Sequence, residues 1–283
     1  MPELPEVETV ARGVDKRVRG ERIVSAWFGS HRQPFKTPAA RQARSLEDRV
    51  FLEVHRTGKH IVCELGASGA RVQLGAEESV AAAQWIVHLG MTGRLLVTRP
   101  DAPVELHTHA RLTLSSGREL RFVDPRRFGR LEFRDLRRDP PFAAPGAEPL
   151  TIGAEEFAAL FRGRKLSIKA ALLNQTLLAG VGNIYADESL FGASIRPQRA
   201  AGRLSRPELE RLRQELVRIL LHAIRLGGSS VSDYVDADGE RGFFQLEHRV
   251  YLRTGEPCLV CGSAIRRILL AGRGTHFCVK CQH

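Results

Sequence analysis

Four cysteines near the end of the chain form two Cys-x-x-Cys pairs. The pairs are Cys258 with Cys261 and Cys278 with Cys281, and 16 residues separate them. Each pair supplies two thiolates from one tight turn, which suits the tetrahedral coordination of zinc better than two disulfide bridges. The sequence therefore predicts one structural Zn²⁺ ion. A closed site of this kind stabilises a folded module and carries no reaction by itself.

The second residue, Pro2, is the first candidate nucleophile. Initiator methionine is usually removed before proline, which would leave a secondary amine at the new N-terminus. An α-amino group has a pKa of about 8 and a lysine side chain about 10.4, so the terminal amine holds about a few hundredfold more free base at neutral pH. An amine that attacks a sugar carbon forms an iminium intermediate, and Glu3 beside it is a candidate proton donor. Spacing alone favours a stiffened terminus, in which Pro2 and Pro5 restrict the backbone and Glu6 and Glu8 serve the helix dipole.

The charge balance favours a polyanionic partner. The 283 residues include 43 Lys and Arg against 32 Asp and Glu, a net charge of +11. Together with a zinc ribbon, this excess points to nucleic acid. No apolar run approaches the ~20 residues of a membrane span, and the acidic N-terminus does not resemble an export signal. Cys63, the one cysteine outside the zinc set, is expected in the core, and the whole pattern fits a reducing cytoplasm.

The first half of the chain reads as one helix followed by short strands. Residues 5–19 predict an amphipathic helix, because their apolar side chains form one stripe and Gly20 suits the stop. Eight β-rich segments then predict an antiparallel sandwich or barrel with this helix packed against it: 23–28, 50–54, 61–65, 84–88, 94–98, 110–114, 119–123 and 130–133.

The second half is helical. A segment rich in proline and glycine, 139–149, is the clearest linker of the chain. Helical periodicity follows it, and Ser205 with Glu208 predicts a capping box at the start of the longest helix. The predicted helices are 154–162, 166–174, 183–192 and 205–226.

These patterns predict an α+β protein of two main domains. An N-terminal antiparallel β-sandwich or barrel with a flanking helix is expected to carry the candidate nucleophile. A C-terminal helical domain with a zinc-ribbon β-hairpin is expected to bind the partner. The expected boundaries are 1–134 for the sandwich, 135–150 for the linker, 151–245 for the helical domain with a loop, and 246–283 for the zinc finger.

Motifs along the whole chain resemble those of bacterial formamidopyrimidine-DNA glycosylases. They are Met-Pro-Glu-Leu-Pro-Glu-Val-Glu-Thr at 1–9, Arg-Thr-Gly-Lys-His at 56–60, His-Leu-Gly-Met-Thr-Gly at 88–93, Asp-Pro-Arg-Arg-Phe-Gly at 124–129, and Gly-Val-Gly-Asn-Ile-Tyr-Ala-Asp-Glu at 180–188. The last of these is similar to the helix–two-turn–helix of that family. The motifs run in the family's order, and the terminal zinc ribbon completes the set.

The resemblance implies a bifunctional enzyme of base-excision repair. Such an enzyme removes oxidised purines, 8-oxoguanine and formamidopyrimidines, from duplex DNA and then nicks the strand by β,δ-elimination. It implies that Pro2 attacks C1′ of the damaged nucleotide and that Glu3 donates a proton that helps to open the sugar. Lys59 would be the second proton donor, used in β-elimination. Arg273 would contact phosphate and serve δ-elimination. Without the resemblance, Lys59 would read as a solvated turn lysine.

The resemblance also implies how the duplex is held. Extruding a base costs a few kcal/mol, and side chains inserted into the vacated space offset that cost. Met91, Arg126 and Phe128 match the family's void-filling residues, although Met91 and Phe128 taken singly would more often be core residues. Asn183 is expected to cap the helix that it begins. The matched DNA contacts are His107, Arg126, Lys165 and Asn183, with Lys169 as a neighbour.

The sequence departs from the family pattern at several positions and leaves two alternatives open. His60 stands where tyrosine or phenylalanine is usual, Thr57 where arginine is common, Asn174 where aspartate is common and Leu252 where glycine is usual; segment 66–83 is longer than the typical turn. One alternative is an endonuclease VIII-type glycosylase for oxidised pyrimidines. Leu4, the Arg126–Phe128 pair and the loop 229–245, which is expected to close over the extruded base, favour the purine enzyme.

The other alternative is a zinc-ribbon DNA-binding protein without catalysis. The expected partner is double-stranded DNA that contains oxidised bases or abasic sites, with no membrane. The protein is expected to be a monomer in the bacterial cytoplasm, associated with the nucleoid through DNA.

Overall fold

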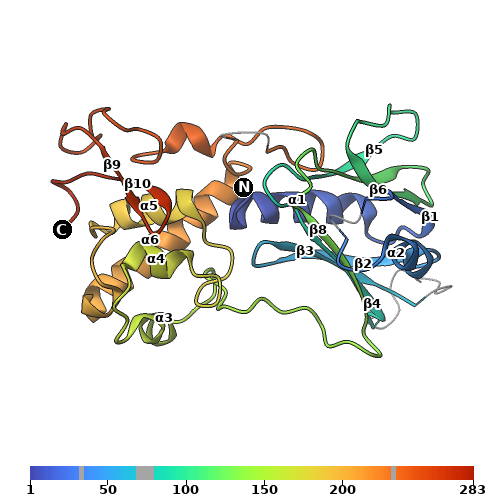
Figure 1. Ribbon diagram of the computed structural model, residues 1–283, viewed down its shortest axis with the longest axis horizontal. Helices are drawn as coiled ribbons and strands as arrows, with labels where there is room; N and C mark the ends of the chain where they lie inside the picture. Colours follow the sequence, from blue (N-terminus) through green and yellow to red (C-terminus); the bar gives the residue numbers. More distant parts are fainter. Residues whose placement is uncertain (32–34, 68–79, 231–233) are drawn as a thin grey trace. The chain divides into compact units, whose positions relative to one another are not determined.

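The computed structural model describes residues 1–31, 35–67, 80–230 and 234–283. The chain divides into two compact units (Figure 1). The N-terminal unit comprises Met1–Ala143 and Ser229–Gly242, and the C-terminal unit comprises Ala144–Gly228 and Phe243–His283. The predicted boundaries placed 229–242 with the helical domain, whereas here this segment belongs with the sandwich. The expected segment 66–83 and loop 229–245 lie partly outside the described residues.

The chain opens with helix α1, Leu4–Val18. Pro5 sits in its first turn, where a missing N–H costs nothing, and Glu3 and Glu6 form a capping box. One face is buried, which confirms the apolar stripe predicted from the sequence: Val7, Val10, Ala11, Val14 and Val18. Leu4, the first residue of the helix, is buried as well.

Two four-stranded antiparallel sheets make up the sandwich. One has the order β1 (Ile23–Phe28), β6 (Thr108–Leu114), β7 (Glu119–Val123) and β5 (Arg94–Thr98). The other has the order β2 (Phe51–Thr57), β3 (His60–Leu65), β4 (Ala83–His88) and β8 (Arg130–Asp135). All eight predicted strands are present, with ends within three residues of the prediction.

The sandwich encloses one large apolar core, to which α1 also contributes. Cys63 lies fully buried within this core, as predicted. Helix α2, Ala39–Leu46, was not predicted, because only Gln42 and Leu46 of its residues are buried and no apolar stripe marks it. Gln42 accepts a hydrogen bond from the indole of the buried Trp85 at 3.1 Å, so the helix is fixed by a polar contact that periodicity does not reveal.

The C-terminal unit begins with four helices, α3 (Ala154–Phe161), α4 (Ile168–Leu173), α5 (Asn183–Gly192) and α6 (Arg206–Arg225), with a 3₁₀ turn η1 (Ala201–Arg203) before the last. The predicted capping box is present, since the Ser205 backbone N–H donates to Glu208 Oε2 at 2.8 Å. A second 3₁₀ turn, η2 (Phe244–Glu247), precedes a hairpin of β9 (Arg266–Leu270) and β10 (Arg273–Phe277). The predicted α+β class is confirmed.

Among the described residues, no helix combines the length and apolar character that crossing a membrane requires.

Candidate functional site

The N-terminal segment is held from two sides. Pro2 is buried and Glu3 is only 5% exposed. The Glu3 backbone N–H donates to one carboxylate oxygen of Glu6 at 2.8 Å, and the Ser229 N–H donates to the other oxygen at 2.8 Å. The Tyr234 hydroxyl donates to the Glu6 carbonyl at 3.3 Å. Glu6 therefore joins the start of α1 to Ser229 and Tyr234, a role that the sequence did not indicate.

Lys59 lies in the turn between β2 and β3 and is 9% exposed. Gly58 before it has φ +62, a conformation that favours glycine. The turn is tied to α1 through Arg56, whose guanidinium lies 2.8 Å from the Glu8 carboxylate and donates to the Gly58 carbonyl at 3.3 Å. Both members of this ion pair are largely buried. Lys59 is therefore not the solvated turn lysine that it would be taken for without the resemblance, because it is buried in a turn anchored to α1.

Two neighbouring loops carry the predicted void-filling residues. Met91 is 39% exposed and Phe128 is 48% exposed, so neither is a core residue. Arg126 is exposed, and its guanidinium carbon lies 4.8 Å from the centre of the Phe128 ring, within cation–π range. The loops touch at Gly90, where an added Cβ would come within 2.5 Å of the Phe128–Gly129 backbone. Only glycine fits this approach.

Asp124, fully buried, organises both loops. Its Oδ1 accepts from the Thr92 hydroxyl at 2.6 Å, and its Oδ2 accepts from the Gly129 N–H at 2.8 Å. Its backbone N–H donates to the carbonyl of His107 at 3.0 Å. His107 is exposed and has φ +68, so this contact holds a strained turn. Sequence reasoning missed Asp124, although an aspartate before Pro-Arg-Arg is a signal for an Asx-type turn.

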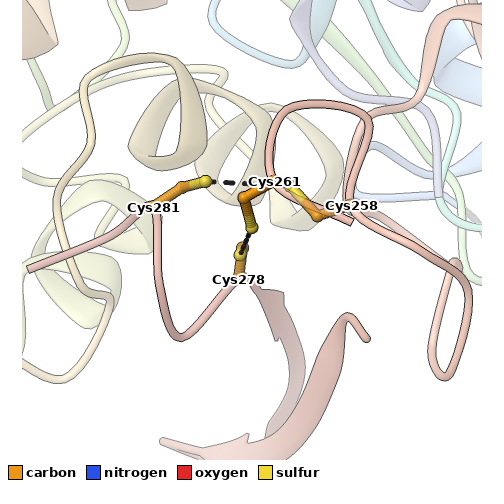
Figure 2. A group of neighbouring side chains, drawn as sticks. All are labelled: Cys258, Cys261, Cys278 and Cys281. Carbon is orange, nitrogen blue, oxygen red and sulfur yellow. Dashed lines mark hydrogen bonds between the residues drawn. The ribbon is translucent and has the colours of Figure 1, made fainter. Parts of the chain in front are cut away.

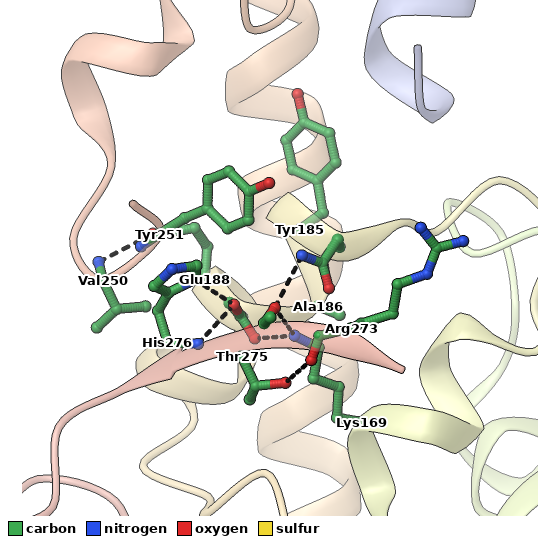
Figure 3. Close-up of polar contacts among 12 residues, drawn as sticks. Lys169, Tyr185, Ala186, Glu188, Val250, Tyr251, Arg273, Thr275 and His276 are labelled. Atoms are coloured by element: carbon green, nitrogen blue, oxygen red, sulfur yellow. Dashed lines mark hydrogen bonds and ion pairs between the residues drawn. The ribbon is translucent and has the colours of Figure 1, made fainter. Parts of the chain in front are cut away.

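In the C-terminal unit, a buried cluster surrounds the carbonyl of Gly274 at the start of β10 (Figure 3). The Asn183 side-chain amide donates to this carbonyl at 3.0 Å, and the Lys169 ammonium donates to it at 3.1 Å. Lys169 also forms an ion pair of 2.7 Å with Asp187, and both are fully buried. The other oxygen of Asp187 accepts from the backbone N–H of His276 at 2.9 Å and lies 3.1 Å from its Nδ1.

Two predictions need correction here. Asn183 does not cap α5: Gly182 is the N-cap and no side chain caps it, because the Asn183 amide is engaged with Gly274 instead. Lys169 does not lie on the surface as a polar neighbour, because its ammonium is neutralised inside the unit. Lys165 and Arg273 are exposed, as a phosphate contact requires. Sequence reasoning missed Asp187 and His276.

A second buried carboxylate in α5 fixes the chain that leads to the zinc module. Glu188 accepts from three successive backbone N–H groups, those of Arg249, Val250 and Tyr251, at distances between 2.8 and 3.1 Å. Figure 3 shows Glu188 beside Val250 and Tyr251. Burial raises the pKa of Glu188, and these three bonds act in the opposite direction. Helix α5 therefore holds the segment before the zinc module and, through Asp187, the hairpin within it.

The four cysteines converge as the spacing predicted (Figure 2). Their Sγ atoms all lie within 4.8 Å of one another, with Cys258 and Cys281 at 3.8 Å and Cys261 and Cys278 at 3.4 Å. Four thiolates around zinc, with Zn–S of about 2.3 Å, would lie about 3.8 Å apart. The donor set and its size therefore fit one structural zinc ion. Cys278 directly follows β10, so a bound metal would fix the strand that begins with Arg273.

Three family models match successive parts of the chain. They are the formamidopyrimidine-DNA glycosylase N-terminal domain over residues 1–131, the formamidopyrimidine-DNA glycosylase H2TH domain over 144–235, and a zinc finger found in FPG and IleRS over 255–283. The chain belongs to the formamidopyrimidine-DNA glycosylase family. It is a DNA glycosylase for the repair of oxidised purines, and lyase activity at abasic sites is a general property of the family.

Similar proteins cover the whole chain. The formamidopyrimidine-DNA glycosylase of Solibacter usitatus is 44% identical over 282 residues, which is 100% of this chain and 99% of the relative. Lactococcus lactis Fpg (MutM), solved with DNA containing N7-benzyl-Fapy-dG, has a TM-score of 0.85 and 34% identity over 99% of both chains. A MutM solved with DNA containing carbocyclic 8-oxo-G has a TM-score of 0.85 and 35% identity, also over 99% of both.

Proposed function

We propose that this glycosylase removes 8-oxoguanine and formamidopyrimidines from duplex DNA with Pro2 as the nucleophile, and then nicks the abasic strand by β,δ-elimination. The observation that carries the proposal is the buried start of α1, where Glu6 fixes the backbone of Glu3 at 2.8 Å. This hydrogen bond restricts the backbone conformations open to Pro2, the residue before Glu3. A nucleophile gains rate from such restriction, because less orientational entropy is lost on reaching the transition state.

The first step forms a bond between the Pro2 nitrogen and C1′. Removal of Met1 exposes the amine, and the glycosidic bond breaks as the base leaves with a proton. The helix N-terminus beside the amine disfavours its protonated form, which helps to keep a free lone pair. Glu3 donates a proton to the sugar ring oxygen, so the ring opens and an iminium ion links the enzyme to the sugar.

The second phase breaks two phosphate ester bonds. Loss of a C2′ proton from the iminium expels the 3′-phosphate, and a further elimination expels the 5′-phosphate. We assign Lys59 to proton transfer in the first elimination, supported by its buried turn next to α1. We assign Arg273 to phosphate contact and to the second elimination, supported by its exposed place at the start of β10.

Met91, Arg126 and Phe128 fill the space that the extruded base leaves. Their exposure supports this role, since an apolar side chain on a solvent-facing loop gains when it enters a base stack. His107, Lys165 and Asn183 contact phosphates. Lys169 acts indirectly, because its buried ammonium holds the Gly274 carbonyl beside Arg273.

The zinc ion supplies folding energy to the hairpin that carries Arg273 and takes no part in bond breaking. We also infer that the protein works on the nucleoid in the bacterial cytoplasm, supported by its net charge of +11 and its bacterial relatives. A fluorescent fusion that does not overlap with a DNA stain in living cells would contradict this inference.

Borohydride trapping tests the nucleophile. The mature wild-type protein, incubated with a duplex that carries one 8-oxoguanine, is expected to become covalently linked to the nicked strand. Pro2→Gly is expected to lower single-turnover excision by at least about 10³-fold, the scale for loss of a covalent nucleophile. A form that retains Met1 should behave likewise.

A panel of duplexes with single defined lesions separates the alternatives. Excision of oxidised pyrimidines in preference to oxidised purines would favour the endonuclease VIII type. A wild-type protein that binds damaged duplex tightly but never becomes trapped would favour a binding protein without catalysis. Full excision by protein whose retained Met1 is verified by mass spectrometry would refute the role of Pro2.

A further inference from the structure

His60 and His88 form a pair of contacting, tilted rings at the end of the second sheet. They are direct cross-strand partners in β3 and β4, and their ring centres lie 4.8 Å apart. Phe142 covers the His60 ring at 4.7 Å, and the Arg134 guanidinium lies over the Phe142 ring at 5.3 Å. The His60 ring thus contacts both His88 and Phe142. A histidine at position 60 is one of the departures from the aromatic residues usual in the family.

Each ring is connected to a different part of the proposed site. His60 directly follows Lys59, so the packing of its ring fixes the last residue of the Lys59 turn. The Nδ1 atom of His88 accepts a hydrogen bond from the Gly90 N–H at 3.1 Å. Gly90 directly precedes Met91 and lies against the Phe128–Gly129 backbone. The pair therefore joins the turn of Lys59 to the loops of Met91 and Phe128.

The hydrogen bond defines the protonation state of His88. A backbone N–H can only donate, so Nδ1 must offer a lone pair and the ring proton must sit on Nε2. A doubly protonated ring would lose this bond and direct a second N–H at Gly90. Two imidazolium ions with ring centres 4.8 Å apart would repel each other, so the two rings disfavour being charged together.

The surroundings oppose charge on both rings. Burial is the main cause that lowers the pKa of each histidine to about 4. The charged groups that face the pair come from the β2–β3 turn, from β8 and from the segment before α2; they are the cations Lys59, Arg130, Arg134 and Lys36, and the anion Glu132. Glu132 and the Thr57 backbone favour the charged form of His60 without reversing the balance.

We propose that His60 and His88 act as an uncharged pair of positioning residues, which holds the Lys59 turn in fixed relation to the Met91 and Phe128 loops. The inference rests on the proposed function, because it assigns the pair to Lys59 and to the void-filling loops. Elimination depends on His60, which adjoins Lys59, and base extrusion depends on His88, which is bonded to Gly90.

The charge state is tested by nitrogen NMR of the intact, ¹⁵N-labelled zinc protein. Both rings are expected to stay neutral from pH 7.5 down to about pH 5, and His88 is expected to show the Nε2–H tautomer. A His88 ring protonated on Nδ1, or either ring titrating near its ordinary pKa of about 6.5, would overturn the proposal.

The positioning role is tested by single-turnover rates on two duplexes at pH 7.5, one with 8-oxoguanine and one with a preformed abasic site. His60→Ala should slow strand nicking of the abasic duplex about tenfold, since small displacements of a proton donor are costly. His60→Phe keeps an aromatic ring between His88 and Phe142 and should restore nicking to within about twofold of wild type, because the position of the ring and not its nitrogens holds the Lys59 turn.

His88→Phe tests the contact between His88 and Gly90. The phenyl ring keeps the contact with His60 but cannot accept the hydrogen bond from the Gly90 N–H. Excision of 8-oxoguanine should therefore fall about tenfold, while nicking of the preformed abasic site changes less. His55→Phe, on the neighbouring strand and bonded to Glu64, is the matched control and should leave both rates unchanged. Equal nicking rates for His60→Ala and His60→Phe would refute the positioning role of His60 and His88. Equal losses of rate on both duplexes for His88→Phe would refute it as well.

These results stay separate from those for the proposed function. If wild-type protein is never trapped by borohydride, the proposed function fails first. If wild-type protein is trapped and every histidine variant matches it, the positioning pair alone fails.

Discussion

The N-terminal unit places Lys59 and Met91 on turns at the ends of strands whose inward side chains fill one large apolar core. The C-terminal unit places Arg273 on a hairpin whose apolar cluster contains, besides cysteines, only Phe191, Val250 and Ile265 among the described residues. A small module of this kind cannot bury enough apolar surface to fix a loop. Metal ligation and buried ion pairs stabilise this hairpin instead. We therefore expect different perturbations to unfold the two units.

Removal of zinc should have the largest effect, and it should be confined to the C-terminal unit. Structural zinc in finger-like modules contributes about 10–16 kcal/mol of apparent folding free energy. Chelation or Cys278→Ala should therefore unfold the hairpin and abolish DNA binding, measured by fluorescence anisotropy. The strands of the sandwich should remain, measured by hydrogen exchange.

Cys63→Ala is the matched control, because Cys63 is buried in the sandwich core outside the metal site. It should retain one zinc per chain and bind DNA. If chelation melted the sandwich together with the hairpin, the contrast between the units would not hold.

Breaking the buried Lys169–Asp187 pair should have the next largest effect. Asp187→Asn leaves the Lys169 ammonium buried without a counter-charge, which costs about 3–5 kcal/mol. Denaturant unfolding should show this loss, and affinity for abasic-analogue DNA should fall as the Gly274 turn loosens. The double variant Lys169→Met/Asp187→Leu should regain most of the stability, since it removes both charges.

The exposed pair Arg206–Glu155, with side chains 71% and 75% exposed, is the control for this change. Glu155→Gln should alter stability by no more than about 1 kcal/mol. A similar loss for Asp187→Asn and Glu155→Gln would mean that buried charge does not hold the hairpin.

Acid should weaken both units through buried histidines. The pKa of His60 and His88 in the sandwich, and of His248 in the C-terminal unit, is lowered to about 4, mainly by burial. Between about pH 6.5 and 4 the unfolded chain binds more protons than the folded one, so stability is full above 6.5 and falls as the pH is lowered. At pH 5 we expect a loss on the order of 1–2 kcal/mol for each histidine, measured by denaturant titration.

The variant His248→Phe should reduce this acid loss in probes of the C-terminal unit only. His60→Phe should reduce it in probes of the sandwich only. An unchanged acid dependence in both variants would place the titrating groups elsewhere.

Asp124→Asn should have a selective effect on excision. It weakens charge-assisted bonds to Thr92 and Gly129, which contribute about 1.5–3 kcal/mol each when the acceptor is ionised. We expect single-turnover excision of 8-oxoguanine to fall about tenfold or more, with nicking of a preformed abasic site less affected. Asp101→Asn, exposed in the β5–β6 connection, should match wild type in both assays.

Much of the fold could be predicted because its signals are local. Alternation, turn residues and a capping box gave eight strands and five helices, and two Cys-x-x-Cys turns gave the zinc site. Helix α2 has no such signal, because its buried residues are only two. The candidate site was predicted where a motif marks a residue, as for Pro2, Lys59 and Met91, and these roles stay predictions.

The residues that hold the site were missed because their partners are distant in sequence. Asp187 bonds His276, 89 residues away, and Glu188 bonds backbone about 60 residues away. One signal was nevertheless present. Two adjacent carboxylates stand in a short helix that is buried nearly all round, where charged side chains occur only with partners.

Ser229–Gly242 belongs to the same compact unit as the sandwich, which limits where the chain can be divided into stable fragments. Tyr234 and Ala237 from this segment complete the apolar core, and the Cβ of Ala237 lies 2.9 Å from where a side chain on Gly13 of α1 would begin. A fragment that stops at Ala143 would leave that surface of α1 uncovered and would lose the Ser229 bond to Glu6. Expression of the amino-terminal half alone should therefore give aggregation-prone material, and adding 229–242 through a short tether should restore solubility.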